Sequence, residues 1–110
     1  MFDLQMDQIA KIKVIGVIRS SGNSKDRQTG NPFSWDNIIL NCEVSEDNPN
    51  SNRLVLAGSD VESYKMKNDF SNVIVREFPV QQFSDLLGCS IRVFYDQYKN
   101  VSCIEVTGID

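Results

Sequence analysis

The chain has 110 residues, of which 41% are apolar and 24% charged, and its formal net charge is −4. This length predicts a single domain over residues 1–110, and the composition argues against global disorder. The absence of histidine excludes histidine general bases, histidine metal ligands and Ser-His or Cys-His pairs. Because the net charge is negative, binding to nucleic acid requires a local basic patch.

The cysteines and the N-terminal residues indicate the compartment. Cys42, Cys89 and Cys103 form an odd set without a Cys-x-x-Cys pair, so neither a disulfide framework nor a zinc site is expected. Free core thiols are typical of a reducing compartment. The first ten residues lack the pattern of a signal peptide, and no apolar run reaches the length of a membrane span. We therefore expect a cytoplasmic protein with no membrane partner and no cofactor.

The first half of the chain predicts a β-hairpin. Residues 11–19 are β-branched and indicate a strand, in which Gly16 predicts a bulge. Residues 20–32 contain Gly, Asn, Ser, Asp and Pro and predict a long polar turn. Residues 34–44 alternate as a strand. One face of this strand carries Ile38, Leu40, Cys42 and Val44, and the other carries Trp35, Asn37, Ile39 and Asn41.

The middle of the chain is harder to interpret. Residues 45–52 predict a loop, residues 53–58 a short third strand, and residues 72–78 a further strand. Ser59 and Glu62 have the spacing of a capping box, so a helical turn is an alternative within residues 58–78.

The last third predicts a helix and a hairpin. Residues 79–88 have apolar positions at helical spacing between a proline and a glycine, which indicates a short amphipathic helix. Residues 89–96 and 101–108 indicate two strands joined by the turn 96–100, with Ile104 and Val106 facing inward.

This order of elements favours one fold class. We predict a mostly β protein, a small five-stranded OB-fold-like barrel with one short helix before the last hairpin. A small sandwich or an SH3-like barrel is the alternative, but neither accounts as simply for a helix over residues 79–88.

An OB-fold binds its ligand across the second and third strands, between the loops that follow the first and fourth strands. Single-stranded nucleic acid needs cations for its phosphates and aromatic rings for its bases, and both residue types occur at these places. Asp26, Asp36 and Asp96 lie in the same region and oppose such binding. The candidate binding residues are Arg19, Lys25, Arg27, Phe33 and Trp35 near the first loop, Tyr64, Lys65 and Lys67 near the third strand, and Tyr98 and Lys99 in the last turn.

Four of these candidates also have a simpler interpretation. Phe33 and Trp35 are placed where aromatic rings often complete a core, and Lys25 and Arg27 are placed where basic residues often only improve solubility. Catalysis is not expected. The segment GNSKDRQTG lacks the ending of a phosphate-binding loop, no Gly-x-Ser-x-Gly elbow occurs, and Glu46 and Asp47 lie in a predicted solvated loop.

Two segments, covering about half the chain, resemble small single-stranded DNA-binding proteins of phages and mobile elements of Gram-positive bacteria. One is the basic loop that ends in Thr-Gly-x-Pro-Phe before an aromatic-led strand. The other is the Leu-Leu-Gly sequence that leads into VFYDQYKNV. The resemblance implies an OB-fold that coats single strands during replication or transfer, often as a homodimer. It also implies binding roles for Arg19, Lys25, Arg27, Trp35, Tyr98 and Lys99.

The sequence therefore favours non-catalytic, sequence-independent binding of single-stranded DNA, or of RNA in its place, and no small-molecule substrate. The alternative is a protein-interaction or assembly module on the same barrel, which the acidic balance and the apolar residues Ile39 and Phe94 would serve. The placement of the aromatic rings discriminates between the two. Exposed rings beside Lys and Arg favour nucleic acid, and rings within apolar surface favour a protein partner.

Overall fold

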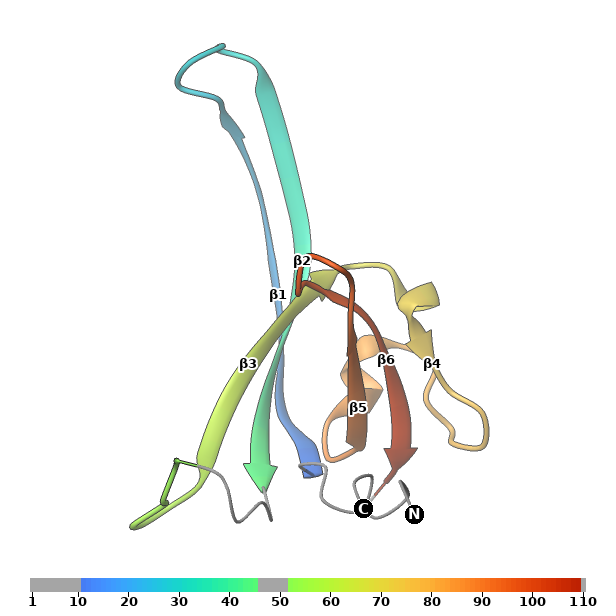
Figure 1. The fold of residues 1–110 in the computed structure, drawn as a ribbon. Coiled ribbons are helices and arrows are strands. Elements are labelled where there is room, and N and C mark those ends of the chain that lie inside the picture. Colours follow the sequence, from blue (N-terminus) through green and yellow to red (C-terminus); the bar gives the residue numbers. More distant parts are fainter. Residues whose placement is uncertain (1–10, 46–51, 110) are drawn as a thin grey trace.

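The computed structural model describes residues 11–45 and 52–109, and these form one mostly β structure (Figure 1). Six strands make a single sheet in the order β3-β2-β1-β5-β6-β4. All neighbours are antiparallel except β4 and β6. The strands are β1 (Lys11–Lys25), β2 (Pro32–Ser45), β3 (Asp60–Lys67), β4 (Val73–Ile74), β5 (Ser90–Tyr95) and β6 (Val101–Gly108).

The sheet curls but stays open. β3 and β6 come close to one another, yet no hydrogen-bonded ladder joins them among the described residues. The prediction of a mostly β protein is confirmed. The prediction of five strands is wrong, because β4 adds a short parallel strand beside β6.

The inner face of the sheet carries the core. Alternation in β2 buries Ile38, Leu40 and Cys42, and Ile104 and Val106 of β6 are buried as predicted. No described polar or charged side chain is buried. Cys42 and Cys89 are buried free thiols, and Cys103 is a half-buried one. Cys42 and Cys89 therefore act as small apolar core residues, as the sequence indicated.

β1 bends at a bulge, as Gly16 predicted. The pairing of β1 with β2 shifts register between Val14 and Gly16. Before the shift β1 also pairs with β5, at Ile12 and Lys13. A bulge bends a strand and increases its twist, so β1 can leave β5 and continue alongside β2 alone.

The predicted long polar turn over residues 20–32 is mostly strand. β1 runs to Lys25 and β2 starts at Pro32, so only residues 26–31 form the turn. The hairpin therefore projects beyond the rest of the sheet (Figure 1). The longest principal extent of the molecule is 52 Å, against 35 and 31 Å for the others.

Two further predictions are wrong, and a third holds only in part. Residues 53–58 form no strand, and β3 lies later, at Asp60–Lys67, with no helical turn at Ser59. Only Val73 and Ile74 of the predicted strand 72–78 are paired. The predicted helix 79–88 is a single 3₁₀ turn, Phe83–Leu86, and a second turn spans Phe70–Asn72. Phe83 and Leu86 are buried by this single turn, so a longer helix is not needed to cover the core.

Candidate nucleic-acid interface

The projecting part of the hairpin, residues 20–36, is here called the arm. It lies beyond the last β2–β3 pair, Asn37 with Lys67, so it is a two-stranded ribbon without a third strand. Every residue of the arm is exposed or half-buried. The arm therefore contributes almost nothing to the core, and its side chains are available to a ligand.

An aromatic pair occupies one face of the arm. Phe33 is 51% exposed and Trp35 is 39% exposed, and their ring centroids are 6.1 Å apart with the planes tilted by 37°. The Trp35 ring lies over its cross-strand partner Gly22. Because Gly22 has no side chain, the indole rests on the backbone and keeps one side open to solvent. This arrangement can accept a stacked base.

The register places two lysines on the same face of the sheet as this aromatic pair. Trp35, Asn37 and Ile39 alternate on the outer face of β2. Lys67 is paired with Asn37 and Lys65 with Ile39. Tyr64 is paired with Leu40 and packs on the inner side against the core. Its burial raises the pKa of the phenol to about 12, and its ring does not join the exposed aromatic face.

The β5–β6 turn brings the last two candidates to the same end of the sheet as the arm (Figure 1). Tyr98 is 73% exposed, and Lys99 adopts a left-handed backbone conformation with φ of 67°. A groove of about 510 Å³ lies between this turn and β3. Its lining includes Asn37, Lys65 and Lys67 on one side and Asp96, Asn100 and Ser102 on the other.

The three acids within this region are all engaged in local structure. Asp26 accepts hydrogen bonds from the backbone N–H groups of Gln28 and Thr29, at 2.7 and 3.3 Å. Asp96 accepts them from Tyr98 and Asn100, at 2.8 and 3.0 Å. These two carboxylates shape the turns at which they lie. Both carboxylates keep their negative charge, but the hydrogen bonds hold them within their turns.

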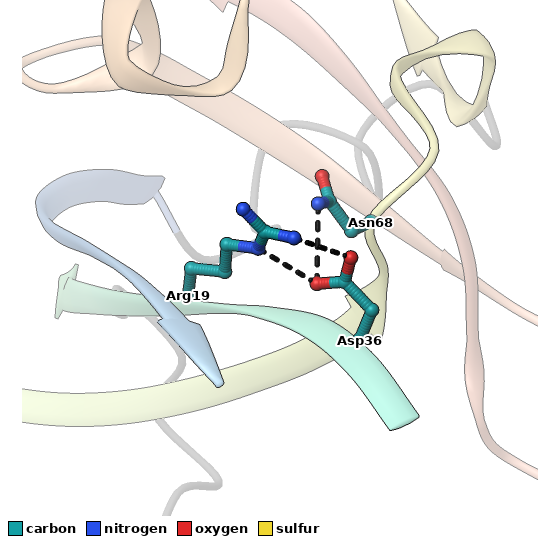
Figure 2. Close-up of polar contacts among 3 residues, drawn as sticks. All are labelled: Arg19, Asp36 and Asn68. Atoms are coloured by element: carbon teal, nitrogen blue, oxygen red, sulfur yellow. Dashed lines mark hydrogen bonds and ion pairs between the residues drawn. The ribbon is translucent and has the colours of Figure 1, made fainter. Parts of the chain in front are cut away.

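The third acid, Asp36, is paired with Arg19 (Figure 2). Nε and Nη2 of Arg19 donate to Oδ1 and Oδ2 of Asp36 at 2.9 and 2.8 Å. The hydrogen bond from Arg19 holds the pKa of the Asp36 carboxyl below its ordinary value, and the same bond raises the pKa of Arg19. Arg19 is thus already committed to a carboxylate and differs from the other basic candidates.

The other described arginines outside the arm also form ion pairs. Arg53 contacts Asp60 and Glu62, and Arg76 and Arg92 both approach Glu105. By contrast, within the described ranges, Lys25, Arg27, Lys65, Lys67 and Lys99 form no ion pair. These five lie at the arm tip, on β3 and in the β5–β6 turn. Among the described residues, basic side chains without an ion pair therefore lie around the arm and the groove, although the molecule as a whole is acidic.

Sequence reasoning did not identify Gly22, Asn68 and Asn100. Gly22 was assigned to a turn, so its pairing with Trp35 could not be foreseen. Asn68 follows β3, whose position the sequence did not predict, and Asn100 lies in the predicted turn 96–100 but was not selected because it is neither basic nor aromatic. Asn37, in contrast, was already placed on the Trp35 face by the alternation of residues 34–44.

The rival apolar surface lies elsewhere. Leu54 and Leu56 are 82% and 89% exposed and precede β3, at the end of β2 that is opposite the arm. Phe94 is exposed on β5, and Ile39 is only half-buried on the outer face of β2. Ile39 therefore offers less apolar surface than its sequence position suggested.

Comparison with protein-family models, with curated proteins and with solved structures finds no match for this chain. In the part of the chain that the structure describes, no three His, Cys, Asp or Glu side chains gather as a metal site. No helix within residues 11–45 and 52–109 has the length and apolarity to cross a membrane.

Proposed function

We propose that this protein is a non-catalytic OB-fold-like domain that binds single-stranded DNA without sequence preference, in phage or mobile-element replication. The observation that carries the proposal is the gathering of unpaired cations around an exposed aromatic pair. Lys25 and Arg27 lie at the tip of the arm whose face carries Phe33 and Trp35, and Lys67 lies on the same face at its base.

The strand order supports the fold part of the proposal. In an OB-fold the first strand lies between the second and the fourth, and the third and fifth strands approach to complete a partly open barrel. Here β1 lies between β2 and β5, and β3 approaches β6. On this correspondence β4 is an addition to the OB-fold pattern, and the groove beside β3 lies where OB-folds hold their ligands.

The mechanism combines two effects. Lys and Arg side chains displace the counterions condensed on the phosphates, which makes the affinity depend on salt. Bases stack on Phe33 and Trp35, and each stacked base is worth about 1–3 kcal/mol. Neither effect reads base identity, so binding is tolerant of sequence.

The test is a titration with an oligo-dT strand, followed by the fluorescence of Trp35, which is the only tryptophan. We expect saturable quenching that weakens as salt is raised. The double variant K25Q/R27Q should bind several-fold more weakly. R76Q, which removes an exposed cation away from the arm, should bind like the wild type. A folded protein whose fluorescence does not respond to oligo-dT at low salt would contradict the proposal.

The protein-interaction module is the second candidate, and the exposed Leu54 and Leu56 favour it. If this surface mediates assembly, light scattering should detect association that rises with concentration, and L54S/L56S should abolish it. These substitutions lie opposite the arm, so they should leave oligo-dT binding unchanged. A wild-type protein that stays monomeric at high concentration would remove the support for self-assembly.

A further inference from the structure

A small polar cluster lies where the arm leaves the sheet (Figure 2). Arg19 forms a two-pronged pair with Asp36, and the side-chain amide of Asn68 donates to Oδ1 of the same carboxylate at 3.2 Å. In addition, the backbone N–H of Asn68 donates to the carbonyl oxygen of Asp36 at 3.1 Å. Asp36 thus receives donors from two different segments at once.

The three residues come from three neighbouring parts of the sheet. Arg19 belongs to β1 and Asp36 to β2, and Asn68 directly follows the last residue of β3. Asp36 is also the first residue of β2 on the arm side of the last β2–β3 pair. The cluster therefore lies at the level where a three-stranded sheet becomes a two-stranded ribbon.

A ribbon of two strands with no buried residue has little to fix its direction, because its own packing is marginal. A cluster that ties both of its strands to the end of β3 supplies that restraint. Trp35 and Asp36 are consecutive in β2, so their side chains lie on opposite faces. The cluster can therefore hold the arm without covering the aromatic face.

We propose that Asp36 is a positioning residue that, through Arg19 and Asn68, fixes the arm so that Phe33 and Trp35 stay aligned with the lysines of β3. The inference rests on the proposed binding of single-stranded DNA, because alignment matters only if one ligand contacts both. A held arm binds more tightly, since the entropy of ordering it is not lost at the moment of binding.

The direction in which D36A changes the affinity distinguishes a positioning role from a purely electrostatic one. D36A removes a negative charge from the binding region, so electrostatics alone predicts tighter binding to oligo-dT. Positioning predicts weaker binding, by about threefold to tenfold. N68A removes one donor without changing any charge and should weaken binding in the same direction but less. E62Q changes the net charge by the same amount on β3 away from the arm, and it should bind like the wild type.

The exchange variant R19D/D36R provides the rescue. It restores an Arg–Asp pair between the same two positions and keeps the wild-type net charge, so binding should return to within about twofold of the wild type. R19D alone places two acids side by side and should bind far more weakly. A double variant no better than R19D would overturn the inference.

The motion of the arm is measured without DNA, which keeps the two proposals separable. The fluorescence anisotropy decay of Trp35 should gain a fast component in D36A and lose it again in R19D/D36R. Circular dichroism serves to confirm that each variant is folded. If the Trp35 anisotropy of D36A decays like that of the wild type, or if D36A binds oligo-dT more tightly, Asp36 does not position the arm. If the decays change as expected but the wild type does not bind oligo-dT, the positioning role stands and the proposed function fails.

Discussion

At the scale of single residues, the contact between Trp35 and Gly22 controls the aromatic face. A Cβ added at Gly22 would lie 2.6 Å from Cζ2 and 2.8 Å from Cη2 of the indole, which is closer than real Cβ contacts allow. The ring would have to move off β1. At Gly16, by comparison, an added Cβ would meet Cβ of Asn41 at 3.4 Å, which is an ordinary contact.

We therefore expect G22A to displace Trp35 while the sheet stays folded. Its emission maximum and its quenching by acrylamide should change, and its affinity for oligo-dT should fall by about tenfold, which is within the range for the loss of one stacked base. G16A should leave both measurements near the wild type. Unchanged Trp35 emission in G22A would mean that the indole does not depend on the space above Gly22.

Tyr64 provides a prediction about pH. Burial is the largest cause that raises its pKa from the ordinary value of 10.0 to about 12. The folded state then holds the phenolic proton more tightly than the unfolded state does, so the stabilisation is present below pH 10 and is lost between about pH 10 and pH 12. Burial also raises the pKa of the Cys42 thiol to about 11, so this thiol contributes a further loss of stability over an overlapping pH range.

The free energy of unfolding, measured by urea denaturation at several pH values, should therefore fall as pH rises above 10. Y64F should fall less steeply over this range, because Phe has no proton to lose, and the share that belongs to Cys42 should remain. Equal slopes for Y64F and the wild type would show that Tyr64 does not titrate as its burial requires.

At the scale of elements, the arm is separable from the core. Ser21 and Asp36 are directly paired, so residues 22–35 can be replaced by Asn-Gly, which closes a two-residue hairpin turn. Because the arm contains no buried residue, the free energy of unfolding should change by less than about 1 kcal/mol. Binding to oligo-dT, followed by the anisotropy of a labelled strand, should be lost. A large loss of stability would show that the arm supports the core.

The arm also shows where sequence reasoning succeeds and fails. Residues 34–44 were predicted well, because one face of that strand must be apolar to meet the core. Residues 20–25 were predicted as a turn because Ser, Gly and Asn dominate there, yet a ribbon with no core face needs no apolar alternation. β3 was missed for a related reason. Its outer face carries Val61, Ser63, Lys65 and Lys67, and only Tyr64 and Met66 pack inward.

The candidate site was only partly predictable for the same physical reason. The residue types of a cation-and-ring surface are visible in the sequence, and the candidate residues near the first loop and in the last turn were selected from them. Which basic side chains lack an ion pair depends on which residues the sheet places opposite each other. Arg19 cannot be told from Lys25 until the register brings Asp36 to it.

At the scale of the whole molecule, charge is segregated. The net charge is −4, but the three acids near the arm form hydrogen bonds or an ion pair within the protein. Among the described residues, five basic side chains around the arm form no ion pair. The overall electrostatic field of an acidic protein repels DNA at long range, whereas close contacts are governed by the nearby Lys and Arg side chains. The two contributions have different dependences on salt, so they can be separated by experiment.

Suppose that all five basic side chains without an ion pair contact phosphates. The logarithm of the binding constant should then fall with the logarithm of the salt concentration with a slope of about −3.5, from about −0.7 per contact on a single strand. K67Q should reduce the steepness by about 0.7, because one contact is lost. E62Q makes the whole molecule less acidic by one charge but adds no contact, so its slope should equal that of the wild type. If E62Q changes the slope as much as K67Q does, the net charge governs binding and the local surface does not. If only K67Q changes the slope, this acidic protein binds DNA through the few basic side chains that form no ion pair with its own acidic residues.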